Sequence, residues 1–178
     1  MNKGEIEMPI DSEVYSKLKE LFGNSNVEPE WSVTKNMTDD FENGAIYSPR
    51  LDFAIKPFNT SPNFTANIEK IDHAYRRKSG IFEPYISNSE FDFEQNLNPR
   101  CFVAVEVESN SPTRKHKIGS IINAAAIGKV GIVLGTDEKA YKTLIRIKNY
   151  VSYIFSHKKL KIPINNVIIL SKHDFLDI

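Results

Sequence analysis

The chain has 178 residues, enough for one domain with a substantial core and too few for two comfortable ones. Its 23 basic and 23 acidic side chains cancel, so no overall positive charge favours nucleic acid, and such binding would need local clusters. The single cysteine, Cys101, excludes an internal disulfide framework and a multi-cysteine metal site. We therefore expect one domain over residues 1–178, in a reducing compartment.

The sequence contains no signal for export or for membrane insertion. The first ten residues, MNKGEIEMPI, lack the apolar core of a signal peptide. No run approaches the roughly 18 apolar residues that a membrane span needs. We expect a soluble, cytoplasmic protein without a membrane partner.

The first third of the chain predicts one helix followed by two or three strands. The helix covers about Ser12 to Phe22, because apolar residues recur at helical spacing between an Asp11-Ser12 cap and Gly23. Short strands are predicted at WSVTK (31–35) and GAIYS (44–48). RLDFAIKPF then alternates apolar and other residues until Pro57, which we expect to end that strand.

The segment from about 59 to 99 is the least regular part of the sequence, and we interpret it as an insertion between two strands of the core. IEKIDHAYRRKSG predicts a helix ending at Gly80, whereas SPNF (61–64) and NLNPR (96–100) are typical of loops.

The rest of the chain alternates strands and helices. CFVAVEVE (101–108) predicts a strand, and the helix after it is expected to have Ser111 as N-cap and Pro112 at its first position. VGIVLG and NVIILS predict two further strands, separated by a helix over about 137–157. Such units imply parallel strands, so we predict an α/β fold with a mixed β-sheet flanked by helices on both faces.

Two carboxylates interrupt the apolar strand CFVAVEVE. Side chains alternate along a strand, so Glu106 and Glu108 share a face, with Cα atoms roughly 7 Å apart. If partly buried without a cation, each would raise the pKa of the other. Asp52 interrupts a second apolar strand, and if the strands are neighbours the three acids form an oxygen-rich pocket suited to Mg²⁺.

A cation is available from the helix that follows. If Ile118, Ile121, Ile122 and Ala125 form its buried stripe, Arg114 and Lys115 flank the stripe at the first turn, with Lys117 further round. The plainer interpretation is that Glu106 and Glu108 form structural ion pairs with Arg114 and Lys115, or lie at a solvated strand end.

Taken together, SPRLD (48–52), VEVE (105–108) and the helix and strand over 114–135 resemble the PD-(D/E)xK nuclease superfamily. The resemblance implies a restriction-endonuclease-like αβββαβ core with a C-terminal αβ extension. It also implies a Mg-dependent endonuclease, with Mn²⁺ as a second cofactor, that hydrolyses phosphodiester bonds in nucleic acid, most simply DNA. A homodimer is left open.

The resemblance assigns roles by position. Asp52 and Glu106 would bind the metal ion. Glu108, which stands where most members have the motif lysine, would be a catalytic residue that contacts the metal or orients the attacking water. Lys115, or Lys117 as second choice, would supply the missing cation. The alternative is a catalytically inactive nuclease-fold protein that acts as a nucleic-acid-binding or regulatory partner module.

Basic and histidine residues outside the motif carry weaker hypotheses. Arg76, Arg77 and Lys78, together with Arg114, are predicted to contact nucleic-acid phosphates. The alternative for the first three is a solvated helix end, since cations favour helix C-termini. The four histidines lack metal-ligand spacing, and we interpret His116 as part of a polar helix surface.

Overall fold

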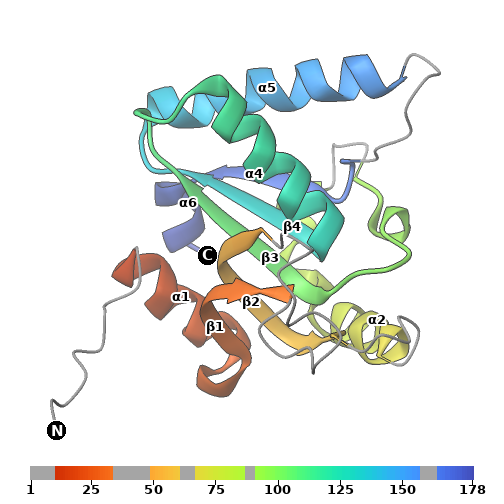
Figure 1. Ribbon diagram of the computed structural model, residues 1–178. Coiled ribbons are helices and arrows are strands. Elements are labelled where there is room, and N and C mark those ends of the chain that lie inside the picture. The colour runs from red at the N-terminus through yellow and green to blue at the C-terminus, as the bar shows by residue number, and fades with distance from the viewer. Residues whose placement is uncertain (1–10, 34–48, 61–66, 87–90, 157–163) are drawn as a thin grey trace, which may run out of the picture.

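The computed structural model of the chain describes residues 11–33, 49–60, 67–86, 91–156 and 164–178 (Figure 1). Its strands are β1 (Val27–Ser32), β2 (Arg50–Phe58), β3 (Cys101–Glu108), β4 (Gly128–Gly135) and β5 (Val167–Ser171). Its α-helices are α1 (Ser12–Phe22), α2 (Ile68–Lys78), α3 (Glu83–Ile86), α4 (Arg114–Ile127), α5 (Glu138–Ser156) and α6 (Lys172–Leu176). Short 3₁₀ turns cover Asn24–Asn26 (η1), Ser79–Ile81 (η3) and Phe93–Gln95 (η4).

The five strands form one mixed sheet in the order β1-β2-β3-β4-β5. The β1–β2 and β2–β3 pairs are antiparallel, whereas the β3–β4 and β4–β5 pairs are parallel. Each parallel pair is joined through a helix, α4 or α5, as parallel strands require. This confirms the predicted α/β class and the mixed sheet.

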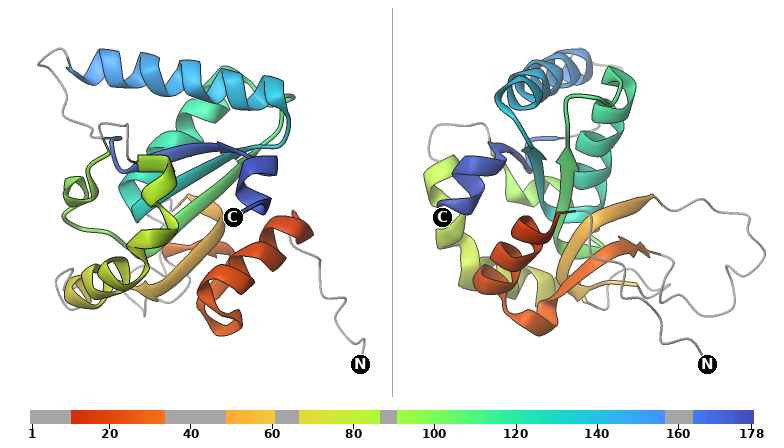
Figure 2. Two further views of the ribbon diagram at one scale, coloured as in Figure 1. Left: turned by 180° about the vertical axis from the view of Figure 1, so that it is seen from behind. Right: turned by 90° about the vertical axis from the view of Figure 1, so that its left-hand side faces the viewer.

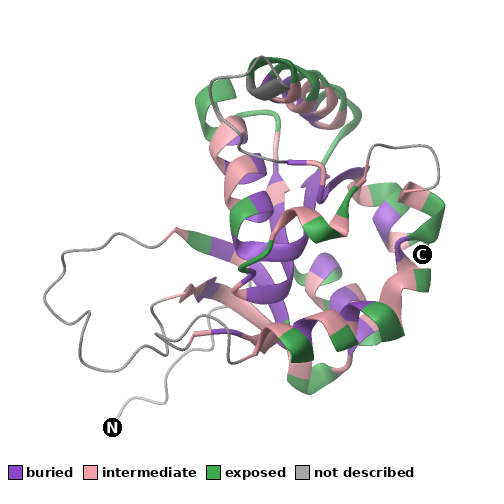
Figure 3. Cartoon of the chain, turned by 90° about the vertical axis from the view of Figure 1, so that its right-hand side faces the viewer, coloured by how far each residue is buried: buried purple, intermediate pink, exposed green. Residues whose placement is uncertain are grey.

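Helices cover both faces of the sheet, as Figure 2 shows from two sides. On one face α4 and α5 bury Ile121, Ala124 and Leu144 against Ala104 and Val133. The opposite face carries α1, α2 and α6, which contribute a second apolar cluster of residues such as Val14, Ile71 and Phe175. In Figure 3 the buried residues concentrate between these layers.

Several predicted elements are confirmed closely. α1 and β3 have the expected bounds, and Asp11 caps α1 by accepting a hydrogen bond from the Val14 main-chain N–H at 3.1 Å. The helix within the 59–99 segment is α2, and the loop at 96–100 is confirmed. Residues 61–64 lie outside the described part of the chain. The interpretation of 59–99 as an insertion remains a prediction.

The N-cap of α4 was predicted wrongly. Thr113, not Ser111, caps the helix, with its Oγ1 accepting from the His116 main-chain N–H at 3.4 Å. The hydroxyl of Ser111 is instead paired with that of Ser109, at 2.8 Å between their oxygen atoms. The helix therefore begins at Arg114, two residues later than a Pro112 start would give.

Two strand predictions also need correction. β1 begins at Val27 rather than Trp31, while residues 34–35 and the predicted strand at 44–48 lie outside the described residues. β2 continues through Pro57 to Phe58. Pro57 is tolerated because the β1 pairing ends at Ile55 and the β3 register shifts between Ile55 and Phe58, so no regular ladder bond is lost.

Glycine packing brings α4 close to β4. A Cβ atom on Gly131 would come within 3.0 Å of the Ala124 backbone on α4, so the helix lies directly on the strand. Among the described helices, none is long and apolar enough to cross a membrane.

Candidate active site

A cavity of about 830 Å³ opens where β2 and β3 meet the first turns of α4. Asp52, Glu106 and Glu108 all line it, so the structure brings the three predicted acids to one place. The reason is the register: Phe53 of β2 pairs with Val105 of β3, which puts Asp52 opposite Glu106. Neighbouring positions on antiparallel strands share a face of the sheet.

Asp52 is fixed by the adjacent strand. Its Oδ2 accepts a hydrogen bond of 2.7 Å from the main-chain N–H of Val107, at the point where the regular β2–β3 ladder ends. Burial raises the pKa of the Asp52 carboxyl, against the lowering effect of this hydrogen bond, and the negative charge of Glu108 raises it further. The carboxyl group is thus held rigidly in a site that disfavours its charge.

Glu106 is the most strongly perturbed acid of the cavity. Its side chain is buried, and this burial, reinforced by the charges of Asp52 and Glu108, raises its pKa to about 9. The carboxylate accepts hydrogen bonds from the Asp52 main-chain N–H and from the Asn123 side chain, which lower the pKa without offsetting the burial. At neutral pH Glu106 therefore holds a proton in the metal-free protein.

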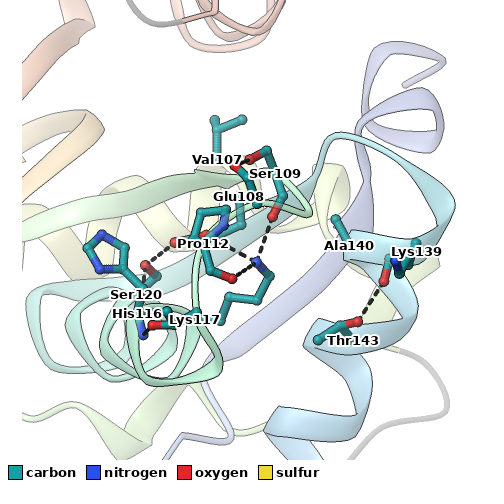
Figure 4. Close-up of polar contacts among 12 residues, drawn as sticks. Val107, Glu108, Ser109, Pro112, His116, Lys117, Ser120, Lys139, Ala140 and Thr143 are labelled. Atoms are coloured by element: carbon teal, nitrogen blue, oxygen red, sulfur yellow. Dashed lines mark hydrogen bonds and ion pairs between the residues drawn. The ribbon is translucent and has the colours of Figure 1, made fainter.

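Glu108 is equally buried but has different partners. Its Oε1 accepts a hydrogen bond of 2.5 Å from the Ser120 hydroxyl, and its Oε2 lies 3.8 Å from the Lys117 ammonium (Figure 4). No hydrogen bond satisfies this Oε2 atom among the described residues. Glu108 is therefore partly neutralised from α4, through an ion pair that sequence analysis placed on Lys115 and Arg114.

Lys117 is a buried residue whose ammonium holds the loop between β3 and α4. It donates to the main-chain oxygens of Ser109 at 2.6 Å and Pro112 at 3.0 Å, in addition to pairing with Glu108. With an exposure of 1 %, it does not line the cavity. The predicted apolar stripe of α4 had placed Lys117 further round the helix, but Lys117 and Ser120 are buried and Ile122 is only half-buried.

Lys115 occupies the position expected of a cation that faces the substrate. It is exposed and lines the cavity wall, and no ion pair joins it to an acid of the described chain. Arg114 is also exposed but does not line the cavity. On the opposite wall, Arg50 contributes a second cation, which pairs with Glu30 at 2.6 Å. Lys115 is thus the better placed of the two predicted catalytic lysines.

The basic run Arg76, Arg77 and Lys78 lies at the end of α2 and does not reach this cavity. Lys78 donates to the main-chain oxygen of Leu21 at 3.0 Å, which satisfies a carbonyl at the C-terminus of α1. Arg76 and Arg77 are exposed. The structure therefore separates this run from the predicted acids.

A polar face of α4, which the sequence patterns did not predict, also lines the cavity. His116, Ser120 and Asn123 follow one another at helical spacing, and all three line the cavity wall. Ser120 contacts Glu108, and Asn123 contacts Glu106. The i, i+4, i+7 spacing of polar residues on a helix next to an acidic strand was the available signal. Asp11 lines the cavity as well, paired with Lys172 at 2.8 Å.

Comparison of the chain with protein-family models, with curated proteins and with solved structures found no match. The chemistry of the site is therefore inferred from its own residues.

The residues of the cavity fit a hard divalent cation. Asp52 and Glu106 offer two adjacent carboxyl groups, and burial together with neighbouring negative charges raises the pKa of each. A bound cation would relieve this environment. Within the described ranges, no three His, Cys, Asp or Glu residues form a ligand cluster.

Proposed function

We propose that this chain is a metal-dependent nuclease that hydrolyses phosphodiester bonds in DNA. The observation that carries the proposal is the pair of half-buried Asp52 and buried Glu106, held on adjacent strands where both line an open cavity. Burying an ionised acid without a cation costs free energy, and acids with such perturbed pKa values cluster at functional sites.

The order of elements supports a restriction-endonuclease-like core. The αβββαβ pattern is matched by α1, β1, β2, β3, α4 and β4 in chain order. In the sheet, β3 is antiparallel to β2 and parallel to β4. In this proposal α5 and β5 form the C-terminal extension, and the candidate acids lie at the positions that the superfamily motif assigns to them.

Each residue of the site has a defined task in the proposed reaction. Asp52 and Glu106 would hold Mg²⁺, or Mn²⁺, which when bound supplies positive charge against the charge that grows on the phosphate. Lys115 adds a second positive charge from the cavity wall. Asn123 orients Glu106 through its hydrogen bond. Glu108, held by Ser120 and Lys117, shapes the floor of the cavity and keeps the start of α4 in place.

One observation favours a second candidate, an inactive nuclease-fold protein that binds nucleic acid or regulates a partner. Glu108 stands in place of the motif lysine, and Lys117, a predicted substitute, is buried away from the cavity. In that case the cavity would bind a metal ion or nucleic acid without turnover, and only Lys115 and Arg50 would offer exposed positive charge.

The two candidates are separated by metal-dependent cleavage. Plasmid and single-stranded DNA are incubated with the purified protein in Mg²⁺, in Mn²⁺ and in EDTA, beside the Asp52→Asn and Glu106→Gln variants. The nuclease proposal expects cleavage by the wild type in metal only, and none by either variant while both remain folded by circular dichroism. DNA binding without turnover in either metal would favour the second candidate.

A further inference from the structure

The proposed function leaves the histidine of the cavity wall without a task. His116 lies in the first turn of α4, is exposed, and lines the same cavity as Asp52 and Glu106. Figure 4 shows its ring beside Ser120, whose hydroxyl donates to Glu108. Among the described acids, none forms an ion pair with this ring.

The backbone of His116 is fixed although its ring is open to the cavity. Its main-chain N–H donates to the Thr113 hydroxyl, and its carbonyl oxygen accepts from the Ser120 hydroxyl at 3.3 Å. The residue therefore sits in the rigid first turn of a 14-residue helix whose next turns hold Glu108 and Glu106. The fixed backbone limits the positions that the His116 ring can take in the cavity that the acids line.

Hydrolysis of a phosphodiester is helped by a proton donor for the leaving oxygen, a task that no other residue of the cavity has been given. When water attacks the phosphorus atom and the bond to the leaving oxygen breaks, the electron pair stays on that oxygen as an alkoxide. Alkoxides are poor leaving groups, and a positioned proton donor accelerates such steps by about 10²- to 10⁴-fold. The lysine and arginine of the cavity wall, Lys115 and Arg50, contribute positive charge to the cavity.

We propose that His116 is a further catalytic residue, the general acid that protonates the leaving oxygen. This inference rests on the proposed nuclease function. The imidazolium gives its proton to the departing alkoxide, which leaves as an alcohol, while the attacking water releases a proton to solvent and becomes part of the phosphomonoester. Solvent then returns a proton to the imidazole, and no oxidant or other co-reactant is needed.

The charges that face the ring come from every wall of the cavity. Asp11 contributes from α1, Arg50 and Asp52 from β2, Glu106 and Glu108 from β3, and Lys115 from α4 itself. Among these side chains, the imidazole of His116 has two ring nitrogens, of which one can donate a proton and the other can accept one. It is therefore the group suited to give a proton in one step and recover it in the next.

The test compares two leaving groups in otherwise identical DNA. The first substrate is an oligonucleotide with ordinary phosphodiesters, and the second carries sulfur in place of the leaving oxygen at the scissile bond, identified from the wild-type product ends. A thiol is a much stronger acid than an alcohol, so sulfur departs without a proton. We expect His116→Gln to lower the single-turnover rate on the first substrate by about 10²-fold or more, and on the second by less than about threefold.

A matched control is His73→Gln, because His73 is an exposed histidine on α2 that does not line the cavity. We expect this variant to cleave both substrates at the wild-type rate. Equal losses on both substrates with His116→Gln would overturn the general-acid role, because a binding or structural role does not distinguish the leaving atoms. No loss on either substrate would overturn it too. Failure of the wild type to cleave either substrate in Mg²⁺ or Mn²⁺ would instead contradict the proposed function.

Discussion

Asp52 and Glu106 hold each other across the β2–β3 pair through main-chain groups. Asp52 accepts a hydrogen bond from the N–H of Val107, the residue after Glu106, and Glu106 accepts one from the N–H of Asp52. Each acid therefore replaces a carbonyl oxygen of the ladder at the point where the regular pairing ends. The geometry of the two acids is set by the sheet, and this rigidity is what a preorganised ligand pair needs.

The raised pKa of Glu106 predicts how stability changes with pH in the metal-free protein. An acid whose pKa is higher in the folded state binds a proton more tightly there, so its contribution is full below about pH 4.5 and is lost as pH rises toward about 9. We expect the free energy of unfolding in EDTA to fall over this range. Denaturant unfolding at several pH values measures it.

Glu106→Gln is the control for this pH dependence, because glutamine is neutral at every pH. We expect the variant to be more stable than the wild type by several kcal/mol at pH 9, and similar to it at pH 5, since the pKa of Glu106 rises from 4.5 to about 9 and one pKa unit corresponds to about 1.4 kcal/mol. A parallel fall of both proteins with pH would show that another group causes the effect.

The buried pair of Glu108 and Lys117 predicts a strong and specific effect on stability. Lys117→Met leaves Glu108 buried without its cation and removes two hydrogen bonds to loop carbonyls, so we expect a loss of about 3 kcal/mol. Lys115→Met, two residues away and exposed, should cost less than about 0.5 kcal/mol. Urea unfolding of both variants gives the comparison.

The double variant Glu108→Gln/Lys117→Met tests whether the pair acts as a unit. Removing both charges should recover part of the loss seen with Lys117→Met alone, because no unpaired charge then remains buried. Additive losses would mean that Lys117 stabilises the loop independently of Glu108.

The positions of the cations predict which of them DNA contacts. With Ca²⁺ in place of Mg²⁺, Lys115→Met should reduce the slope of log affinity against log salt by about one, because one phosphate contact is lost. Arg77→Met, on α2 and away from the cavity, should leave the slope unchanged. Fluorescence anisotropy of a labelled oligonucleotide at four salt concentrations measures both. An equal change in the two variants would place DNA across α2 as well.

The sequence was sufficient to predict the three acids because strand alternation is a short-range property. Glu106 and Glu108 had to share a face once β3 was recognised, and Asp52 joined them through the antiparallel register of β2. The element order followed from the same local patterns. The alternation within β3 depends on residues close together in the chain, whereas the position of Asp52 depended on the long-range pairing of β2 with β3, which the sequence offered only as a condition.

The cation could not be assigned from sequence because helix burial depends on tertiary contacts. Ile121 and Ala125 of the predicted stripe are buried as expected, but Lys117 and Ser120 of α4 are buried as well and contact Glu108 of β3. A lysine is accepted there because Glu108 and two loop carbonyls receive its protons. The role of His116 was missed for a similar reason, since only the packed structure places its turn of α4 beside the acids.

Cleavage of DNA by the wild type and by Asp52→Asn in Mg²⁺ is the most direct test of the central claim that the acids form a nuclease site. Asparagine keeps the shape and an oxygen acceptor for the Val107 N–H, so the fold should be retained. We predict metal-dependent cleavage by the wild type and a loss of about 10³-fold or more in the variant, in line with the loss of a group that holds transition-state charge. Equal cleavage by the two folded proteins would contradict the claim.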